Sequence, residues 1–371
     1  MPDIKLTRGV PPIESFPTDQ LKECAIAVLE SEGEVVLQYG PSRGYRALRE
    51  WIANEAGSQA DQVILGQGSL QLQDLCARVF VNAGDVVYVE EPSYDRALTI
   101  FRRAGALLVG CPVGADGPSV EQMERRLKQG ERPKLFYVIP DFQNPSGSVL
   151  SEEKRRRIVE LAQAYGFWIL EDVPYRKLRY RGEDLPTLLD LAPDRVLQMS
   201  SFSKLISPGL RVGYIVVPPQ LAASLAKMAE DTYVNASYLN QAMVYEFIRR
   251  GWLEPQLERL KRLYAPRLDA MLEALNEAFS DLATWQRPDG GFFVGVTLEK
   301  SIPAEKLLQR ASSAGLALTD GRGFFANGGG DQFVRLPFCA LTADEIKLGI
   351  AKLAEVVRDT PEACRRFGLY S

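Results

Sequence analysis

The chain has 371 residues, of which 46% are hydrophobic and 25% charged, and its formal net charge is −4 at pH 7. This length is too great for one ordinary hydrophobic core, so two domains are expected. The slightly acidic balance gives no electrostatic footprint for nucleic acid. No run approaches the roughly 20 apolar residues that span a bilayer, and the N-terminus has no apolar signal region. We therefore expect a cytoplasmic protein without a nucleic-acid or membrane partner.

The histidine and cysteine content narrows the possible chemistry. The chain contains no histidine, which excludes Ser-His-Asp and Cys-His catalysis and zinc sites of the H-E-x-x-H kind. An enzyme with this sequence must move protons with Lys, Asp, Glu, Tyr or Cys. The five cysteines are scattered and form no C-x-x-C pair, which fits a reducing compartment.

Helical and β-rich patterns alternate along the first part of the chain. One helix is predicted over 21–32, stopping at Gly33, and another over 45–56. Short β-rich runs then alternate with helical patterns. The runs lie at 85–89, 134–139, 166–170, 195–199 and 212–217, and the helical patterns at 70–81, 93–104, 120–129 and 152–164. This alternation predicts an α/β sheet, mostly parallel and covered on both faces.

The pattern changes after Pro219. Stretches 221–231 and 237–279 are mainly helical, and the tail mixes strands at 291–296 and 332–336 with helices at 304–313 and 343–357. We predict a smaller α+β domain there. The expected division is an N-terminal segment, 1–40, packing with the small domain, a large domain, 41–255, and a small C-terminal domain, 256–371.

One dense basic run occurs, KRRR at 154–157, within a helical pattern. We interpret it as a solvated helix face rather than a binding patch.

The segment SSFSKLISPGLRVGY at 200–214 frames Lys204 with small hydroxyl residues and places Arg211 seven positions later. A lysine offers an amine to an aldehyde, and hydroxyls with a guanidinium hold an anion. The segment therefore suits a Schiff base beside a phosphate, as pyridoxal 5'-phosphate (PLP) requires. The alternative is a Ser/Gly loop with a solvated lysine.

Asp172 ends an apolar run in ILEDVPY at 169–175. A carboxylate at the carboxyl end of a buried parallel strand lies where α/β sheets bind ligands. Near a pyridine nitrogen it would keep that nitrogen protonated. The alternative is an aspartate that caps the next turn.

Two further segments have polar groups suited to anions. GQGSLQ at 66–71 fails the dinucleotide fingerprint because residue 71 is glutamine, but a Gly-Ser turn before a helix is an anion site. In FVRLPF at 333–338, Arg335 alternates with apolar residues. It is either an edge charge or a buried fork for a carboxylate.

Three more segments carry candidate residues. Tyr94 in EPSY at 91–94 is a candidate stacking plate for a flat cofactor or an ordinary core tyrosine. Asn144 lies in QNPSG at 143–147, which is otherwise a plain turn. Tyr39 lies in QYGPSRGYRALR at 38–49, otherwise a loop leading into a helix.

In this order the segments resemble class I/II, fold-type I PLP-dependent aminotransferases over nearly the whole chain. The matching motifs are S-x-S-K-x-x-x-P-G-L-R-x-G, E-D-x-x-Y, Q-N-P-[TS]-G, G-S-Q-Q, E-P-x-Y, Q-Y-x-x-x-x-G-x-x-x-L-R and R-L-x-F. The opening GVPPIESFP at 9–17 resembles the subgroup of 2-aminoadipate, kynurenine and related aminotransferases. The same fold forms the effector domain of MocR-type regulators, whose winged helix is not found here. The chain departs from the family at Leu70, usually glutamine, and at Pro337.

The resemblance implies a role for each candidate. Lys204 would form the aldimine and shuttle the proton, Asp172 would pair with the pyridinium, and Tyr94 would stack on the ring, which makes these three the catalytic candidates. Tyr175 and Asn144 would reach the ring oxygen, and Arg335 with Asn144 would bind the substrate carboxylate. The phosphate would be held by Gly68, Ser69, Leu70 through its backbone, Ser201, Ser203, Arg211 and, across a homodimer interface, Tyr39.

The resemblance thus implies a PLP-dependent aminotransferase that moves an amino group from an α-amino acid to a 2-oxo acid. The alternatives are a PLP-dependent lyase, replacement enzyme or cyclase, and a PLP-sensing regulatory module without turnover. Candidate substrate-pocket residues are Arg8, Ile13, Phe16 and the segment 290–293. Their partly apolar character favours aromatic or aliphatic side chains, whereas Arg8 would suit an acidic one.

Overall fold

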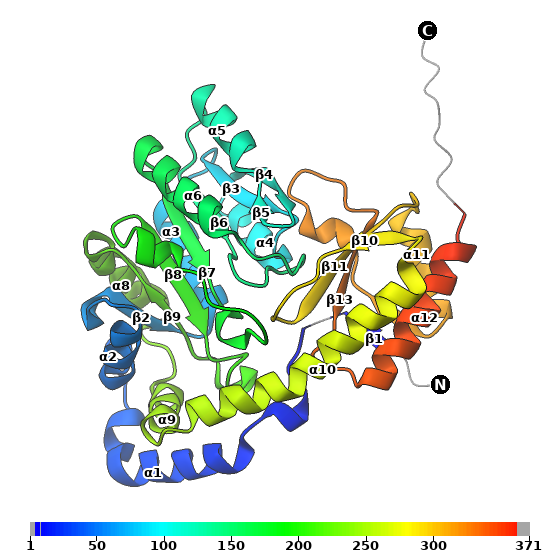
Figure 1. The fold of residues 1–371 in the computed structure, drawn as a ribbon. Coiled ribbons are helices and arrows are strands. Elements are labelled where there is room, and N and C mark those ends of the chain that lie inside the picture. Colours follow the sequence, from blue (N-terminus) through cyan, green and yellow to red (C-terminus); the bar gives the residue numbers. More distant parts are fainter. Residues whose placement is uncertain (1–3, 8, 362–371) are drawn as a thin grey trace.

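The computed structural model describes residues 4–7 and 9–361, which form a larger and a smaller part joined by helix α10 (Leu253–Phe279) (Figure 1). The larger part is built on an eight-stranded sheet in the order β2-β9-β8-β7-β6-β3-β4-β5. The strands are β2 (Val63–Gly66), β3 (Val86–Glu91), β4 (Leu107–Gly114), β5 (Gly117–Pro118), β6 (Leu135–Val138), β7 (Trp168–Asp172), β8 (Val196–Ser201) and β9 (Gly213–Val216).

The sheet is mixed but mostly parallel, as predicted. Strands β4, β3, β6, β7 and β8 pair in parallel, whereas β9 runs antiparallel between β8 and β2, and β5 runs antiparallel to β4. The central strand β6 is buried at each of its positions. A strand covered on both faces must be apolar throughout, which explains the continuous apolar runs in the sequence.

Helices cover both faces of the sheet (Figure 1). Phe136 faces one hydrophobic cluster, and its neighbours Leu135 and Tyr137 face the other, because side chains alternate along a strand. The cluster of Leu135 includes side chains of α3 (Ser69–Phe80), α4 (Asp95–Arg103) and α8 (Pro219–Tyr233). The cluster of Phe136 includes side chains of α2 (Arg46–Glu55), α5 (Val120–Lys128), α6 (Glu152–Tyr165), α7 (Leu188–Leu191) and α9 (Tyr238–Arg249).

The smaller part contains an antiparallel sheet of β10 (Ala283–Trp285), β11 (Phe293–Leu298) and β13 (Phe333–Pro337). A parallel pair, β1 (Ile4–Leu6) and β12 (Leu316–Leu318), lies beside it, with helices α11 (Ala304–Ser313) and α12 (Ala343–Asp359). Short 3₁₀ helices are η1 (Ile13–Ser15), η2 (Ala60–Gln62), η3 (Arg176–Leu178), η4 (Pro208–Leu210) and η5 (Gly321–Phe324).

The N-terminal segment contacts both parts. Strand β1 pairs with β12 of the smaller part, whereas α1 (Thr18–Val36) packs against α9. The prediction that residues 1–40 pack with the small domain therefore agrees with the position of β1 but not with that of α1. The expected boundary after residue 255 falls inside α10, near its beginning. The division of the chain at 40 and 255 stays a prediction.

The sequence prediction omits strands β1, β2, β4, β5, β10 and β12, and two predicted helices differ in detail from those observed. Helix α1 (Thr18–Val36) consists of two helical stretches separated by a kink at Glu32 (φ −135°, ψ 16°), so its first stretch ends beside Gly33 as predicted and a further turn follows. The predicted helical stretch 237–279 is two helices, α9 and α10, because Gly251 adopts a positive φ of 73° between them.

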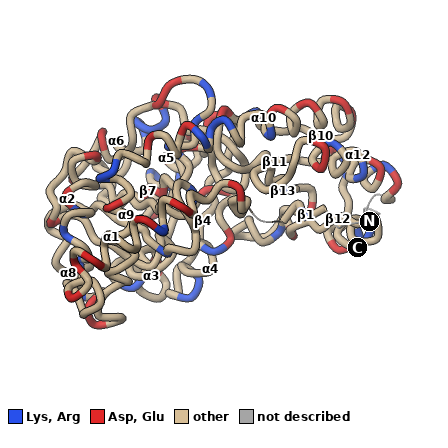
Figure 2. The backbone as a smooth tube through the Cα atoms, turned by 90° about the horizontal axis from the view of Figure 1, so that it is seen from below, with Lys and Arg blue, Asp and Glu red and all other residues tan. Residues whose placement is uncertain are grey.

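Charged residues of both signs are interspersed along the described chain (Figure 2). Among the described residues, the structure has no helix with the length and apolar character needed to cross a bilayer.

The basic run 154–157 is only partly the solvated face that the sequence suggested. Lys154, Arg156 and Arg157 pair with acidic groups near the surface. Arg155 is fully buried, and its guanidinium lies 2.8 Å from Asp141 Oδ1. The prediction is wrong for Arg155, because a helix face that packs on the sheet can hold an arginine when a buried carboxylate compensates it.

Asp141 is the counter-charge for three guanidinium groups. Besides Arg155, Arg176 lies 3.1 Å from Oδ2 and Arg179 lies 3.4 Å from Oδ1.

We expect Asp141→Asn to lower the free energy of unfolding by about 3–5 kcal/mol, because it leaves a buried cation uncompensated. Chemical denaturation at a fixed protein concentration measures this. As a control, Asp116→Asn, which breaks the more exposed pair with Lys154, should cost less than about 1 kcal/mol. Equal effects of the two variants would contradict the prediction.

Candidate active site

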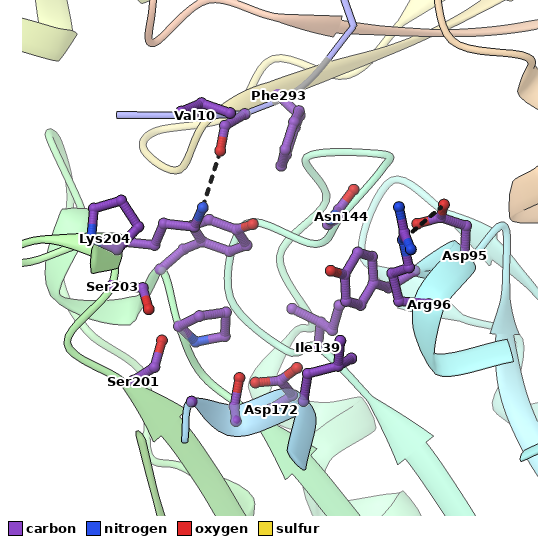
Figure 3. A pocket seen from close by; sticks show the side chains of 18 of the residues that line it. Val10, Asp95, Arg96, Ile139, Asn144, Asp172, Ser201, Ser203, Lys204 and Phe293 are labelled. Carbon is purple, nitrogen blue, oxygen red and sulfur yellow. Dashed lines mark hydrogen bonds and ion pairs between the residues drawn. The ribbon is translucent and has the colours of Figure 1, made fainter. Parts of the chain in front are cut away.

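A cavity of about 600 Å³ opens where the strands of the larger sheet end, facing the smaller part (Figure 3). Asp172 is the last residue of β7, and Ser201 is the last residue of β8. Tyr94 follows β3 and Asn144 follows β6. Parallel strands bring their carboxyl ends to one edge, so residues distant in sequence meet in this cavity.

The structure brings nearly all the predicted site residues together. Those that line the cavity are Gly68, Ser69, Leu70, Tyr94, Asn144, Asp172, Tyr175, Ser201, Ser203, Lys204, Arg211 and Arg335. Tyr39 is the exception, because it does not line the cavity and its side chain is 80% exposed.

Lys204 lies in the turn after β8, and its side chain points across the cavity toward the N-terminal segment (Figure 3). Its Nζ donates a hydrogen bond to the carbonyl oxygen of Gly9, at 2.9 Å. Burial lowers the pKa of Lys204, and the positive charges of Arg211 and Arg335 lower it further. A lysine with a lowered pKa offers the neutral amine that is nucleophilic and basic.

Asp172 lies on the sheet side of the cavity with only one of its oxygens satisfied. The hydroxyl of Tyr137 donates to Oδ2 at 2.9 Å. Oδ1 is buried and has no hydrogen-bond partner among the described residues. Burial raises the pKa of Asp172 to about 7. A cationic N–H donor at Oδ1 would stabilise the charged form of this buried carboxylate and give Oδ1 a hydrogen-bond partner. The protonated pyridine nitrogen of PLP would supply such a donor.

An anion cradle lies at the beginning of α3. Gly68 has a positive φ of 84°, and the backbone N–H groups of the first helical turn follow it. The guanidinium of Arg211 lies above this turn, with its Nη2 donating to the carbonyl oxygen of Gln67 at 2.9 Å. A Cβ at Gly213 would lie 2.5 Å from the nitrogen of Ser69, so only glycine lets β9 pass this close. The cradle fits the phosphate of PLP.

Arg335 is buried, which excludes the edge-charge interpretation. Its Nη1 donates to Asn144 Oδ1 at 2.9 Å and its Nη2 to the carbonyl oxygen of Thr7 at 2.6 Å. The rings of Phe293 and Phe324 lie 4.7 and 4.6 Å from its guanidinium carbon, and its Nε has no partner among the described residues. A planar fork in an apolar setting suits a carboxylate.

Several residues of the site were not identified from the sequence. Thr7, Gly9 and Val10 cover the cavity from the N-terminal segment, and Asp95 and Arg96 lie at its side. Gly9 and Val10 belong to the segment 9–17 that resembles the subgroup, but that resemblance assigns them no role in the site, and Thr7, Asp95 and Arg96 lie in none of the matching motifs.

The candidate substrate-pocket residues have mixed outcomes. Phe293 lines the cavity, whereas Ile13 and Phe16 do not, and the side chain of Ile13 is 85% exposed. Arg8 lies outside the described residues.

Residues 2–353 match the family described as aminotransferase class I and II. A 2-aminoadipate transaminase of Thermus thermophilus is 36% identical over 354 residues, covering 94% of this chain and 89% of that enzyme. Aromatic-amino-acid aminotransferase 1 of Thermococcus litoralis is 35% identical over 369 residues, covering 96% of this chain and 88% of that enzyme.

The fold is similar to that of a crystal structure of alpha-aminoadipate aminotransferase from Thermus thermophilus, complexed with N-(5'-phosphopyridoxyl)-L-leucine. The TM-score is 0.92 at 36% identity, covering 96% of this chain and 92% of that chain. These matches confirm the predicted subgroup, the fold type and PLP as the cofactor, and they favour transamination over elimination, replacement or cyclisation. The chain belongs to the class I and II aminotransferases, a family of PLP-dependent enzymes.

Proposed function

We propose that Lys204 carries the cofactor of this aminotransferase and that Arg335 receives the α-carboxylate of its amino and 2-oxo acid substrates. One observation carries the proposal. A partly buried lysine with a lowered pKa, an unpartnered oxygen of Asp172 and a buried guanidinium fork all face the same cavity. These are the three groups that the reaction requires: an amine for the aldehyde, an anion for the ring nitrogen and a cation for the carboxylate.

The remaining lining residues would hold the cofactor. Asp172 would accept from the pyridine nitrogen, Tyr94 would stack on the ring, and Asn144 and Tyr175 would reach the ring oxygen. The phosphate would lie among the backbone of Gly68, Ser69 and Leu70, the hydroxyls of Ser201 and Ser203, and the guanidinium of Arg211. When bound, PLP supplies an electron sink for the pair released at the substrate Cα.

The residues around the substrate then perform three tasks. Arg335 and Asn144 orient the carboxylate, which fixes the direction of the Cα–H bond. Lys204 Nζ would remove the Cα proton as a general base and then, as a general acid, donate it to the C4' carbon of the cofactor. Burial supports the base role, because it favours the neutral amine.

We propose an apolar substrate side chain, aromatic or aliphatic. Val10 and Phe293 are apolar residues that lie together on one side of the cavity (Figure 3), and Ile139 adds an apolar side chain on the sheet side. The relative from Thermococcus litoralis is named an aromatic-amino-acid aminotransferase, which supports this choice. The relative from Thermus thermophilus is named a 2-aminoadipate transaminase, which favours acidic side chains instead.

We also propose a cytoplasmic homodimer whose active sites are shared. Tyr39 and Leu37 are large exposed hydrophobic residues on the same segment, 80% and 71% exposed, which favours burial against a second copy. Tyr39 would then reach the phosphate of the partner's site. A reducing compartment fits the cysteines at 24, 76, 111 and 339, which are buried and unpaired.

Mixed dimers test the shared site. Tyr39→Ala and Lys204→Ala are each expected to be impaired, because each removes one group from every site. A mixed dimer of the two variants has one site with both groups intact. After co-refolding in equal amounts, activity should therefore rise to about one quarter of wild type, since half of the dimers are mixed. Activity no greater than that of the separate variants would contradict a shared site.

The first experiment on the proposed function is the absorption spectrum of the PLP-loaded protein as single amino acids are added without any 2-oxo acid. We expect the band of the lysine-bound cofactor to be lost, with one equivalent of 2-oxo acid released per site. The amino acids that react define the donor class. Absence of a cofactor band even after adding PLP would overturn the assignment of Lys204.

A further inference from the structure

A group of hydrogen bonds joins the larger part of the molecule to the loop 324–327 of the smaller part. Glu91, the last residue of β3, accepts from the backbone nitrogens of Ala326 and Asn327 at 3.0 and 3.3 Å, both through Oε1. Arg102, on α4, donates through Nη2 to the carbonyl oxygens of Phe325 and Ala326, at 3.1 and 2.8 Å. The carboxylate of Glu91 therefore binds the N–H groups of this short stretch of backbone, and the guanidinium of Arg102 binds its carbonyl oxygens.

This loop leads directly to the carboxylate-binding group. The nitrogen of Ser93, next to Tyr94, donates to the carbonyl oxygen of Phe324 at 2.8 Å. The side chain of Phe324 is buried, and its ring lies 4.6 Å from the guanidinium carbon of Arg335. The loop thus connects the segment that carries Tyr94 in the larger part with the packing of Arg335 in the smaller part.

The neighbouring strand of the sheet leaves space for the carboxylate of Glu91. Gly110, on the neighbouring strand β4, pairs beside this end of β3. A Cβ at Gly110 would lie 2.5 Å from the carboxyl carbon of Glu91 and equally close to Oε2. Glycine at this position leaves the room that the carboxylate needs to lie against β4 while it faces the loop.

We propose that Glu91 and Arg102 form a latch that positions Arg335 through Phe324 and thereby tightens the binding of the substrate α-carboxylate. Both are positioning residues, since neither lines the active-site cavity. The inference rests on the proposed role of Arg335. A bidentate fork loses affinity when its plane shifts, so releasing the loop weakens substrate binding without removing a reacting group.

The test is the half-reaction of the PLP-loaded enzyme with its amino donor, followed by absorbance in single turnovers. Glu91→Ala and Arg102→Ala should each raise the apparent Kd of the amino donor about tenfold, and leave the maximal rate within about twofold. Glu91→Gln keeps an acceptor oxygen in the same place and should restore most of the affinity. The cofactor spectrum should be unchanged in all three. Because the side chain of Arg102 is exposed, its alanine variant should fold even if Glu91→Ala does not.

Arg103 provides a matched control. It is the next residue of α4, it is exposed, and its side chain has no hydrogen-bond or ion-pair partner among the described residues. Arg103→Ala should leave the Kd unchanged. In an Arg335→Lys background, Arg102→Ala should raise the Kd by much less than in the wild type, because the two changes act through one group.

Three results would overturn the latch. They are an unchanged Kd in Arg102→Ala, an equal rise in Arg103→Ala, and a full additional rise in the Arg335→Lys background. Failure of the wild type to react in the half-reaction is a different outcome, and it would instead overturn the proposed function.

Discussion

Lys204→Ala should lower turnover by at least about 10⁴-fold while the protein still binds PLP, now without a covalent bond. In the proposed mechanism, the variant loses the amine that would carry the cofactor and the base that would take the Cα proton. The anion cradle at the beginning of α3, which we propose for the phosphate, includes Arg211 but not the Lys204 amine, so cofactor affinity should survive in part. Among the residues that the structure describes, no other lysine lines the cavity, so none is placed to substitute.

Reduction with borohydride followed by mass spectrometry measures the covalent bond directly. The wild-type chain should gain the mass of a reduced phosphopyridoxyl group, located on the peptide with Lys204, and the variant should not. Lys227→Ala serves as the control, because Lys227 is exposed and pairs with Asp231 on the surface of α8. Turnover of Lys204→Ala within tenfold of the wild type would be incompatible with the assignment.

The sequence was most informative where one segment supplies both the strand and its functional end. Asp172 and Lys204 each follow an apolar run, so their placement at one edge of a parallel sheet follows from the alternating pattern. The sequence said nothing about Tyr137. Its hydroxyl reaches Asp172 only because β6 and β7 pair in a register that places Tyr137 beside Leu170.

Contacts between distant segments were also beyond the sequence. The carbonyl oxygens of Thr7 and Gly9 contact Arg335 and Lys204, and backbone acceptors carry no sequence signal. Arg155 was assigned to a solvated face because its neighbours are charged, and only the packing of α6 on the sheet shows that it is buried beside Asp141. Local pattern predicts which elements form, whereas long-range pairing decides which side chains meet.

The end of the first helical stretch was more accessible to sequence reasoning. Glycine is a common helix terminator, and the sequence predicts a stop at Gly33. The regular helix of α1 breaks at Glu32, one residue before Gly33. Only the further turn after this kink, which places the buried side chain of Val36 in the hydrophobic core, depends on tertiary packing.

Asp172→Asn should lower kcat about 10³-fold, because a neutral amide cannot hold a proton on the ring nitrogen of the cofactor. Burial raises the pKa of Asp172 to about 7, so the carboxylate is not stabilised in its charged form by the protein alone. A cationic ring N–H at the unpartnered Oδ1 would stabilise that form, and each of the two charges then supports the other. Asparagine keeps the shape of the side chain and removes this mutual support.

Tyr137→Phe separates the charge of Asp172 from its orientation. This variant retains the carboxylate and removes only the hydrogen bond to Oδ2, so kcat should fall by about tenfold or less. Steady-state kinetics at saturating PLP and substrates compares the two variants, and the cofactor spectrum reports the protonation of the ring. If Asp172→Asn lost no more activity than Tyr137→Phe, the charge of Asp172 would have no part in catalysis and Oδ1 would need another partner. A much larger loss in the asparagine variant assigns the effect to the charge, since asparagine keeps an oxygen that can accept from the hydroxyl of Tyr137, whereas Tyr137→Phe removes that hydrogen bond.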